Sequence, residues 1–209
     1  MLQHEINISA DFKPKRLRAY RVPENLKPMV EAEINELLKF GTIKPSKSEM
    51  GSPIVCVLQG KDGVRIAVDY RYLNKYCEGD AYPMPVISDL IQKVGQAKFI
   101  SLCDIKSVCH QIEVKPEHQW LTAFVWNSGL FQYTRPPFGQ KGSGNGFVRA
   151  VQQVLCPIRD ITASFVDDIA VHSNEFDQHL RDFEKFFKVI NDSGFTLNLQ
   201  KNVVLHRVK

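Results

Sequence analysis

The spacing of apolar residues changes along the chain, and a helical period is clearest in two segments. From residue 24 to residue 40 the apolar positions follow this period, and Gly41 stands where a helix commonly ends. From residue 175 to residue 191 a longer stripe does the same, formed by Phe176, Leu180, Phe183, Phe187 and Ile190. We predict helices over both segments, a short amphipathic helix over 85–96, and a further helix from about Gly146.

Other parts of the chain carry apolar runs of strand length that are separated by turn residues. The clearest is the stretch 52–74, where two such runs flank Lys61-Asp62-Gly63. We predict a hairpin here, because Asp-Gly is a strong turn signal. Further strands are predicted within 97–107, 110–116, 121–138 and 195–199.

This arrangement of strands and helices predicts an α+β fold with a mainly antiparallel sheet. A helix and a hairpin come first, and strands alternate with helices in the remainder of the chain. We interpret the chain as a small β-rich lobe followed by an α+β lobe, with a boundary near Pro83 to Pro85. Two domains, 1–84 and 85–209, are therefore expected.

Two adjacent aspartates, Asp167 and Asp168, interrupt an apolar run in the sequence SFVDDIAV. Carboxylates are costly to bury, so their place in a strand-like run needs a physical reason. One alternative is an ordinary surface turn, in which aspartates are common. The other is a hairpin tip that presents carboxylates to a hard divalent cation such as Mg²⁺, which prefers oxygen ligands.

A third carboxylate, Asp104, ends the predicted strand FISLCD, and 167 − 104 = 63 residues separate it from the pair. Two strand ends side by side in one sheet would gather the carboxylates about two metal ions, as in phosphoryl-transfer sites. The alternative is that Asp104 only caps a turn, and spacing alone leaves both open. A divalent-metal hydrolase on another fold would also explain the aspartates. The histidines have no ligand spacing, and we interpret them as structural.

Composition narrows the remaining classes of function. With 44% hydrophobic and 24% charged residues among 209, the chain is expected to fold around a core. Its net charge of +4 mildly favours a polyanionic partner. Five cysteines without paired spacing predict neither disulfides nor a zinc site, and we interpret them as reduced thiols in an intracellular setting. No apolar run approaches the roughly 20 residues of a membrane span, and the start lacks a signal-peptide core.

A series of short sequence motifs resembles the reverse transcriptase domain of gypsy-type long-terminal-repeat retrotransposons. In chain order the motifs are GTIKPSKSEMGSPIVCV (41–57), KDGVRIAVDYRYLN (61–74), DAYPMP (80–85), SLCDIKS (101–107), HQIEV (110–114), TAF (122–124), PFG (137–139), FVDDIAVHS (165–173) and HL (179–180). The resemblance implies a right-hand polymerase fold, with fingers in 1–84 and palm in 85–209. It places an inserted fingers segment near 110–140, and it implies that thumb, connection and ribonuclease H parts are absent after Lys209.

The resemblance also implies an activity and its cofactor. The activity is RNA-directed DNA polymerisation, in which deoxynucleoside triphosphates are joined to a primer on an RNA or DNA template. The catalytic residues would be Asp104, Asp167 and Asp168. With the main-chain carbonyl of Ile105, these carboxylates would bind two Mg²⁺ ions, or Mn²⁺ in their place. No membrane partner is expected, and the oligomeric state is left open.

Basic and aromatic residues in the matching motifs are assigned to substrate by the same resemblance. The nucleotide-binding residues would be Lys61, Arg65, Cys109, Phe138 and Lys201, and the residues supporting template or palm would be Arg71 and Gly139. Each cation has a simpler alternative. The two hairpin cations and Lys201 would then be solvated surface charges. Arg71 would instead pair with Asp69 or Asp80.

Three places depart from the family pattern. Phe165 stands where the family has a tyrosine, and Cys109 stands where it has the aromatic residue beneath the nucleotide sugar. After PFG, the segment Gln140–Gly146 has lost a proline and gained glycines, which disfavour a helix start by roughly 0.5–1 kcal/mol each relative to alanine. We expect this segment to be loose and the sugar gate at Cys109 to be open. The alternative function is a domesticated, non-catalytic fold that binds RNA or protein.

Overall fold

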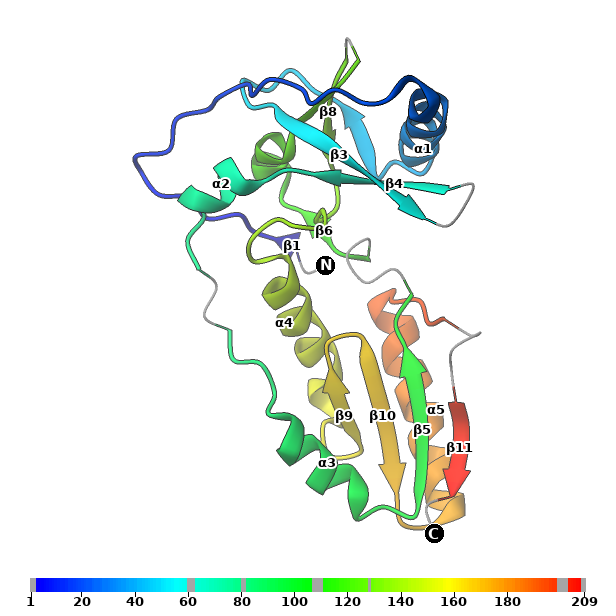
Figure 1. Cartoon of the computed structure of the whole chain (residues 1–209). Helices are drawn as coiled ribbons and strands as arrows, with labels where there is room; N and C mark the ends of the chain where they lie inside the picture. Colours follow the sequence, from blue (N-terminus) through cyan, green and yellow to red (C-terminus); the bar gives the residue numbers. More distant parts are fainter. Residues whose placement is uncertain are drawn as a thin grey trace. The chain divides into compact units, whose positions relative to one another are not determined.

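The structure is a computed structural model, and it describes residues 3–59, 63–79, 82–106, 111–127, 129–198 and 203–207. The chain divides into two compact units (Figure 1). Unit 1 contains Ala81–Gln111 and Gly144–Lys209, and unit 2 contains Leu2–Asp80 and Ile112–Ser143. The domain bounds suggested by the sequence, 1–84 and 85–209 with an insertion near 110–140, stay a prediction.

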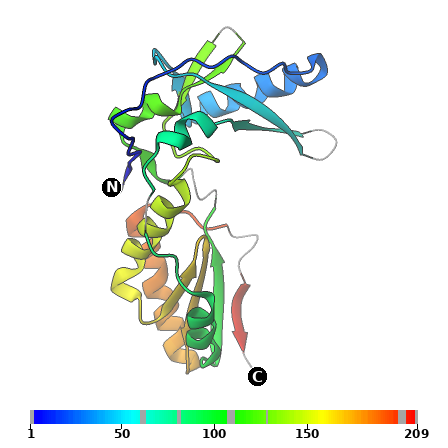
Figure 2. The ribbon, with the colours of Figure 1, turned by 60° about the vertical axis from the view of Figure 1, so that its left-hand side comes forward.

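Unit 1 is built on a four-stranded sheet with the order β11-β5-β10-β9. Its strands are β5 (Phe99–Asp104), β9 (Thr162–Phe165), β10 (Asp168–Ser173) and β11 (Val203–Arg207). All three pairings in this sheet are antiparallel, as the sequence predicted. Its helices are α3 (Ile87–Gly95), α4 (Ser143–Leu155) and α5 (Phe176–Ser193), with a 3-10 turn at Cys156–Ile158. Helices α4 and α5 cover one face of the sheet (Figures 1 and 2), which leaves its other face more open.

Helix α5 turns a partly polar face toward the sheet. Its buried residues are His179, Asp182, Phe186 and Ile190, which recur at helical spacing. Serines of the sheet provide the partners: Ser101 Oγ lies 2.9 Å from His179 Nε2, and Ser173 Oγ donates to Asp182 Oδ2 at 2.9 Å. Because these buried polar groups are hydrogen-bonded, they pack in the core without the full cost of desolvation.

Unit 2 is built on a five-stranded sheet with the order β2-β8-β7-β3-β4. Its strands are β2 (Ile43–Pro45), β3 (Ser52–Gln59), β4 (Gly63–Val68), β7 (Phe124–Trp126) and β8 (Gly129–Tyr133), and a separate pair joins β1 (Gln3–His4) to β6 (Glu113–Val114). Its helices are α1 (Lys27–Lys39) and α2 (Arg71–Tyr76), with 3-10 turns at Glu24–Leu26 and Pro116–Thr122. Buried residues of α1, such as Val30 and Ile34, join one apolar core with Phe124 and Leu73.

Several predicted elements are confirmed, and others are corrected. The β3–β4 hairpin pairs antiparallel from Gln59 opposite Gly63, so the hairpin prediction is confirmed although its turn lies outside the described residues. Helix α4 begins at Ser143 rather than near Gly146, because Ser143 Oγ donates to Pro137 O and to Gln140 Oε1 and fixes the first turn. The strand predicted at 195–199 is wrong over its described part, 195–198, where Leu197 forms only an isolated bridge with Ile105.

The described helices also bear on membrane insertion. Within the described parts of the chain, none of the helices has both the length and the apolar character that crossing a bilayer requires.

Candidate active site

Two of the three expected catalytic carboxylates lie directly opposite each other in the sheet of unit 1. Asp168, the first residue of β10, pairs with Asp104, the last residue of β5. Side chains of directly opposed residues project from the same face, and like charges in such a pair are destabilising. The end of this sheet is therefore a place where a cation would relieve repulsion.

The third carboxylate, Asp167, belongs to a tight turn. Asp168 pairs with Phe165, which leaves Val166 and Asp167 as the two turn residues between β9 and β10. Val166 has a φ of 55°, a conformation that is a genuine outlier for a β-branched residue. Ile105 N donates to Asp167 O at 3.0 Å, which ties the tip to the end of β5 beside Asp104.

Asp104 is held in place by a residue that follows α5. Asn198 Nδ2 donates to Asp104 Oδ2 at 3.1 Å, and Asn198 N donates to Asp104 O at 2.8 Å. Gln111 anchors the same segment, because it accepts from Thr196 N at 2.7 Å and donates to Thr196 O at 3.0 Å and to Lys106 O. Asn198 therefore orients both the main-chain carbonyl and the carboxylate of Asp104.

The carboxylate pair can be tested for its fit to a divalent ion. Among the residues that the structure describes, no three histidine, cysteine or acidic side chains lie close enough to form a metal-binding group. Asp104 and Asp168 are nevertheless opposed on one face, and Asp167 is attached next to them through its main chain. Carboxylate oxygens are the ligands that Mg²⁺ and Mn²⁺ prefer, so the residues present fit such an ion. Ile105 is only 1% exposed and connects the two strand ends through its N–H group.

In unit 2 the structure brings Arg65 and Phe138 together. Arg65 is an exposed residue of β4, and its guanidinium carbon lies 4.1 Å from the centre of the Phe138 ring. Phe138 is itself 49% exposed. This cation–π contact restricts the arginine while leaving the pair open to a ligand.

The segment after Phe138 is anchored to unit 2. Gly139 has a φ of 84° and its carbonyl accepts from Asn74 Nδ2 at 2.7 Å, while Asn74 Oδ1 accepts from Lys141 N at 2.7 Å. Gln140 is buried, and its Oε1 lies 2.9 Å from Nε2 of buried His4. The sequence predicted a loose segment, whereas these contacts hold its first residues; how the segment meets a nucleotide stays a prediction.

Arg71 forms an ion pair with Asp69, one of the two partners that the simpler alternative predicted. Its Nε donates to Asp69 Oδ1 at 2.9 Å and its Nη2 donates to Asp69 Oδ2 at 2.7 Å. Tyr20 completes the cluster, because its hydroxyl donates to Asp69 Oδ2 at 2.7 Å. Hydrogen bonds from Arg71, ahead of that from Tyr20, hold the pKa of Asp69 well below its usual range. The Arg71 side chain is still 83% exposed, and its role toward template stays a prediction.

Comparison with known proteins shows the family. A family model described as "Reverse transcriptase (RNA-dependent DNA polymerase)" matches residues 44–209. The chain belongs to the reverse transcriptase family. The Pol polyprotein of transposon gypsy from Drosophila melanogaster is 32% identical over 200 residues, which cover 92% of this chain and 19% of that relative. The Tf2-3 polyprotein of Schizosaccharomyces pombe is 26% identical, over 96% of this chain and 15% of the relative. The chain thus spans about a fifth or less of these curated relatives.

Solved structures of a reverse transcriptase share the fold. The foamy viral protease-reverse transcriptase in complex with RNA/DNA hybrid has a TM-score of 0.85 and 27% identity, over 97% of this chain and 27% of that one. The same enzyme in complex with dsDNA also has a TM-score of 0.85. The fold is therefore the right-hand polymerase fold, with a palm that contains the mainly antiparallel sheet (unit 1) and with fingers (unit 2).

The reverse transcriptase motifs did not reveal every residue of the site. Lys61, Cys109 and Lys201 lie outside the described residues, so their roles stay predictions. Asn198 was missed although it stands three residues before Lys201, because a single amide between two leucines has no signal of its own. Its contact with Asp104 spans 94 positions in the sequence, a pairing that only the folded chain reveals.

Proposed function

We propose that the chain is the RNA-directed DNA polymerase domain of a retrotransposon-type polyprotein. The observation that carries this proposal is the pairing of Asp104 with Asp168 beside a turn that contains Asp167. The reaction would transfer a nucleotidyl group from a deoxynucleoside triphosphate to the 3′-hydroxyl of a primer. Family membership supports the assignment, and the polyprotein relatives are far longer than this chain.

The proposed cofactor is a pair of Mg²⁺ ions, with Mn²⁺ as a substitute. Asp104, Asp167, Asp168 and the carbonyl of Ile105 would hold them. When bound, two such ions supply activation of the attacking hydroxyl and stabilisation of the leaving pyrophosphate. Asn198 acts as a positioning residue, because its amide donates to one oxygen of Asp104 and so orients the carboxylate.

The fingers would bind the triphosphate of the incoming nucleotide. Arg65 is suited to this role, since a guanidinium makes paired hydrogen bonds with phosphate oxygens. Its stacking on Phe138 at 4.1 Å supports a pre-oriented cation. Lys61, Lys201, Cys109, Gly139 and Arg71 are retained as nucleotide or template contacts on the resemblance alone.

The proposed partner is a primed RNA or DNA template. The foamy viral relative has been solved in complexes with RNA/DNA hybrid and dsDNA, which supports this choice. With a net charge of only +4, the chain should grip its template through few phosphate contacts, and we expect weak binding that falls steeply with salt.

The test is primer extension on an RNA template with Mg²⁺ or Mn²⁺. We expect the chain to extend the primer, and Asp168→Asn to abolish extension while the circular dichroism spectrum is unchanged. Asp160→Asn is the matched control, because the Asp160 side chain is 96% exposed and lies on the loop before β9. Extension by folded Asp168→Asn at the wild-type rate, or no extension by wild type with either metal, would contradict the proposal. A non-catalytic RNA- or protein-binding fold predicts the second outcome.

A further inference from the structure

The segment that begins at Phe138 contains two of the residues assigned to nucleotide and template, and its backbone has much freedom of its own. We call residues 138–143, with the sequence FGQKGS, the nucleotide loop. Two of its six residues are glycines with positive φ, 84° at Gly139 and 95° at Gly142. Glycine loses more conformational freedom on folding than any other residue. The loop therefore depends on contacts with other segments to keep Phe138 stacked against Arg65.

The side chain of Gln140 closes the nucleotide loop from inside. Its Oε1 accepts a hydrogen bond from Ser143 Oγ at 2.8 Å, and its Nε2 donates to Lys141 O and, at 3.7 Å, to Cys77 Sγ. These partners assign the orientation of the amide, because the nitrogen only donates and the oxygen only accepts. The amide oxygen is thus directed toward donors.

His4 reaches this amide oxygen from strand β1. Its Nε2 lies 2.9 Å from Gln140 Oε1, and only 5% of either residue is exposed. Because the oxygen only accepts, His4 Nε2 must carry the proton and donate. The main chain of His4 is fixed in turn: it pairs with Val114 of β6, and Lys115 N donates to His4 O at 2.9 Å. Figure 1 shows β1 beside β6.

We propose that His4 is a positioning residue that holds the nucleotide loop in the conformation that receives the incoming nucleotide. Its hydrogen bond joins positions 136 residues apart and ties the loop to a strand pair. A loop that also visits other conformations binds its ligand with an apparent affinity reduced by the competent fraction. His4 therefore acts on nucleotide affinity through Gln140. This inference rests on the proposed function and deepens it by naming a residue that controls nucleotide use.

A second histidine of unit 2 offers a matched control. His118 Nδ1 accepts from Ile6 N at 3.0 Å, so this imidazole holds the chain two residues beyond His4. Its hydrogen bond is made with that main chain and not with the nucleotide loop. His118→Ala therefore loosens the stretch after β1 while leaving the contact between His4 and Gln140 in place.

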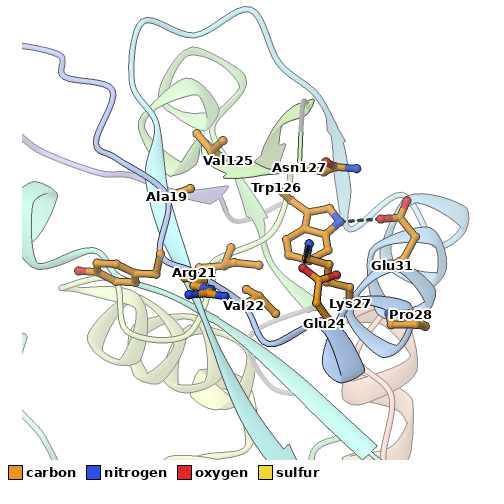
Figure 3. Close-up of a pocket in the computed structure, with 12 residues that line it drawn as sticks. Ala19, Arg21, Val22, Glu24, Lys27, Pro28, Glu31, Val125, Trp126 and Asn127 are labelled. Carbon is orange, nitrogen blue, oxygen red and sulfur yellow. Dashed lines mark hydrogen bonds and ion pairs between the residues drawn. The ribbon is translucent and has the colours of Figure 1, made fainter.

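A second control removes one side-chain hydrogen bond elsewhere in unit 2. Figure 3 shows a cavity of about 620 Å³ at which Trp126 Nε1 donates to Glu31 Oε2 at 2.6 Å. None of the described residues that line this cavity belongs to the nucleotide loop. Glu31→Ala thus measures the general effect of losing one such contact.

The test combines hydrogen–deuterium exchange with primer-extension kinetics. Exchange is followed by mass spectrometry in the peptide that contains the nucleotide loop, and KM and kcat are measured for deoxynucleoside triphosphates. The variants are His4→Ala, His4→Gln, Gln140→Ala, the double variant of His4→Ala with Gln140→Ala, and the two controls. Thermal melting checks that each variant is folded.

We expect His4→Ala to raise deuterium uptake in the nucleotide loop and to raise the nucleotide KM about 2- to 10-fold, the range of one neutral hydrogen bond. His4→Gln retains an N–H donor of similar reach and should stay close to wild type. Adding His4→Ala to Gln140→Ala should have no further effect, because both residues act through one contact. Both controls should keep the wild-type uptake and KM. A histidine that only stabilised the fold would lower the melting temperature and the active fraction, and hence kcat, with KM unchanged.

Three results would overturn the inference: wild-type uptake in folded His4→Ala, a raised uptake without a change in KM, or an equal rise of KM in His118→Ala. The exchange measurement does not need catalysis. If wild type extends no primer and uptake rises in His4→Ala alone, the holding of the loop by His4 stands and the proposed function fails. If wild type extends primers and His4→Ala keeps the wild-type KM, only the inference fails.

Discussion

The contact between Asn198 and Asp104 leads to a sharp prediction about metal binding. Asn198→Ala removes the Nδ2 donor that lies 3.1 Å from Asp104 Oδ2 and keeps the main-chain hydrogen bond of 2.8 Å. The segment should therefore remain bridged to Ile105, while the carboxylate loses its orienting partner. A hydrogen bond to a charged group contributes about 1.5–3 kcal/mol, which corresponds to about a 10- to 100-fold change. Loss of a group that orients a metal ligand typically has an effect of the same size.

The assay for this prediction has a direct and a functional part. Mn²⁺ binding to the chain is measured from the electron paramagnetic resonance signal of free Mn²⁺, and primer extension is then followed over a range of Mn²⁺ concentrations. We expect the affinity of Asn198→Ala to fall about tenfold or more, and high Mn²⁺ to restore much of its extension. A purely structural defect would not be rescued by metal. Asn191→Ala is the matched control, because Asn191 is exposed near the end of α5.

Gln111 supplies a second check of the same reasoning. It anchors Thr196 and Lys106, so Gln111→Ala should act in the same direction through the shared segment. Residues in one hydrogen-bond network couple, and the double variant should therefore lose less than the sum of the two single losses. The reasoning is refuted if Asp104→Asn loses Mn²⁺ while folded Asn198→Ala binds it with wild-type affinity.

Two further predictions concern the fingers and the stability of the palm. Arg65→Ala should raise the KM for deoxynucleoside triphosphates about 10- to 100-fold without changing the affinity for primed template, and an unchanged KM would exclude a triphosphate role. Burial lowers the pKa of His179, opposed in part by Asp182, so the folded state binds fewer protons than the unfolded state. Stability in urea unfolding should therefore fall as the pH decreases below about 6.5, and His179→Gln should reduce that dependence. An unchanged pH dependence in the folded variant would contradict this role of His179.

The palm helix α5 shows where sequence periodicity succeeds and where it fails. Its extent was predicted closely, since 175–191 became Phe176–Ser193. The expected apolar stripe coincides with the buried face only at Ile190, because Phe176, Leu180 and Phe187 are 46%, 45% and 41% exposed. The buried face contains His179 and Asp182 instead. A count of apolar positions cannot find such a face, because its partners Ser101 and Ser173 come from strands elsewhere in the chain.

Local preferences also misplaced elements near the site. Glycines at 144 and 146 predicted a late start of α4, but contacts of Ser143 with Pro137 and Gln140 outweigh their modest cost. The alternating sequence of 195–199 suggested a strand, yet the described part of it, 195–198, is used to hold Asp104 and Lys106. The partners of 195–198 are distant in sequence, and those of Ser143 are specific side-chain and carbonyl contacts three and six residues away, so propensity alone had no access to either.

The sequence identified residues of the candidate site but not how they are arranged in space. The three aspartates were found because the sequence motifs around them match the reverse transcriptase family, and the apolar pattern indicated where the strands end. The register that sets Asp104 opposite Asp168 joins strands 64 positions apart, 168 − 104, and no local pattern specifies it. Lys61, Cys109 and Lys201 remain sequence-based assignments.

The turn of the palm hairpin contains residues that are poorly suited to a tight turn. The palm hairpin has Val166-Asp167, with the valine at a φ of 55°, a strain of about 1–3 kcal/mol. Asp167 follows this valine, and Asp168 comes next, opposite a like charge. Two unfavourable features at one sheet end, where a glycine turn would fold more easily, are best explained by selection for the position of the carboxylates.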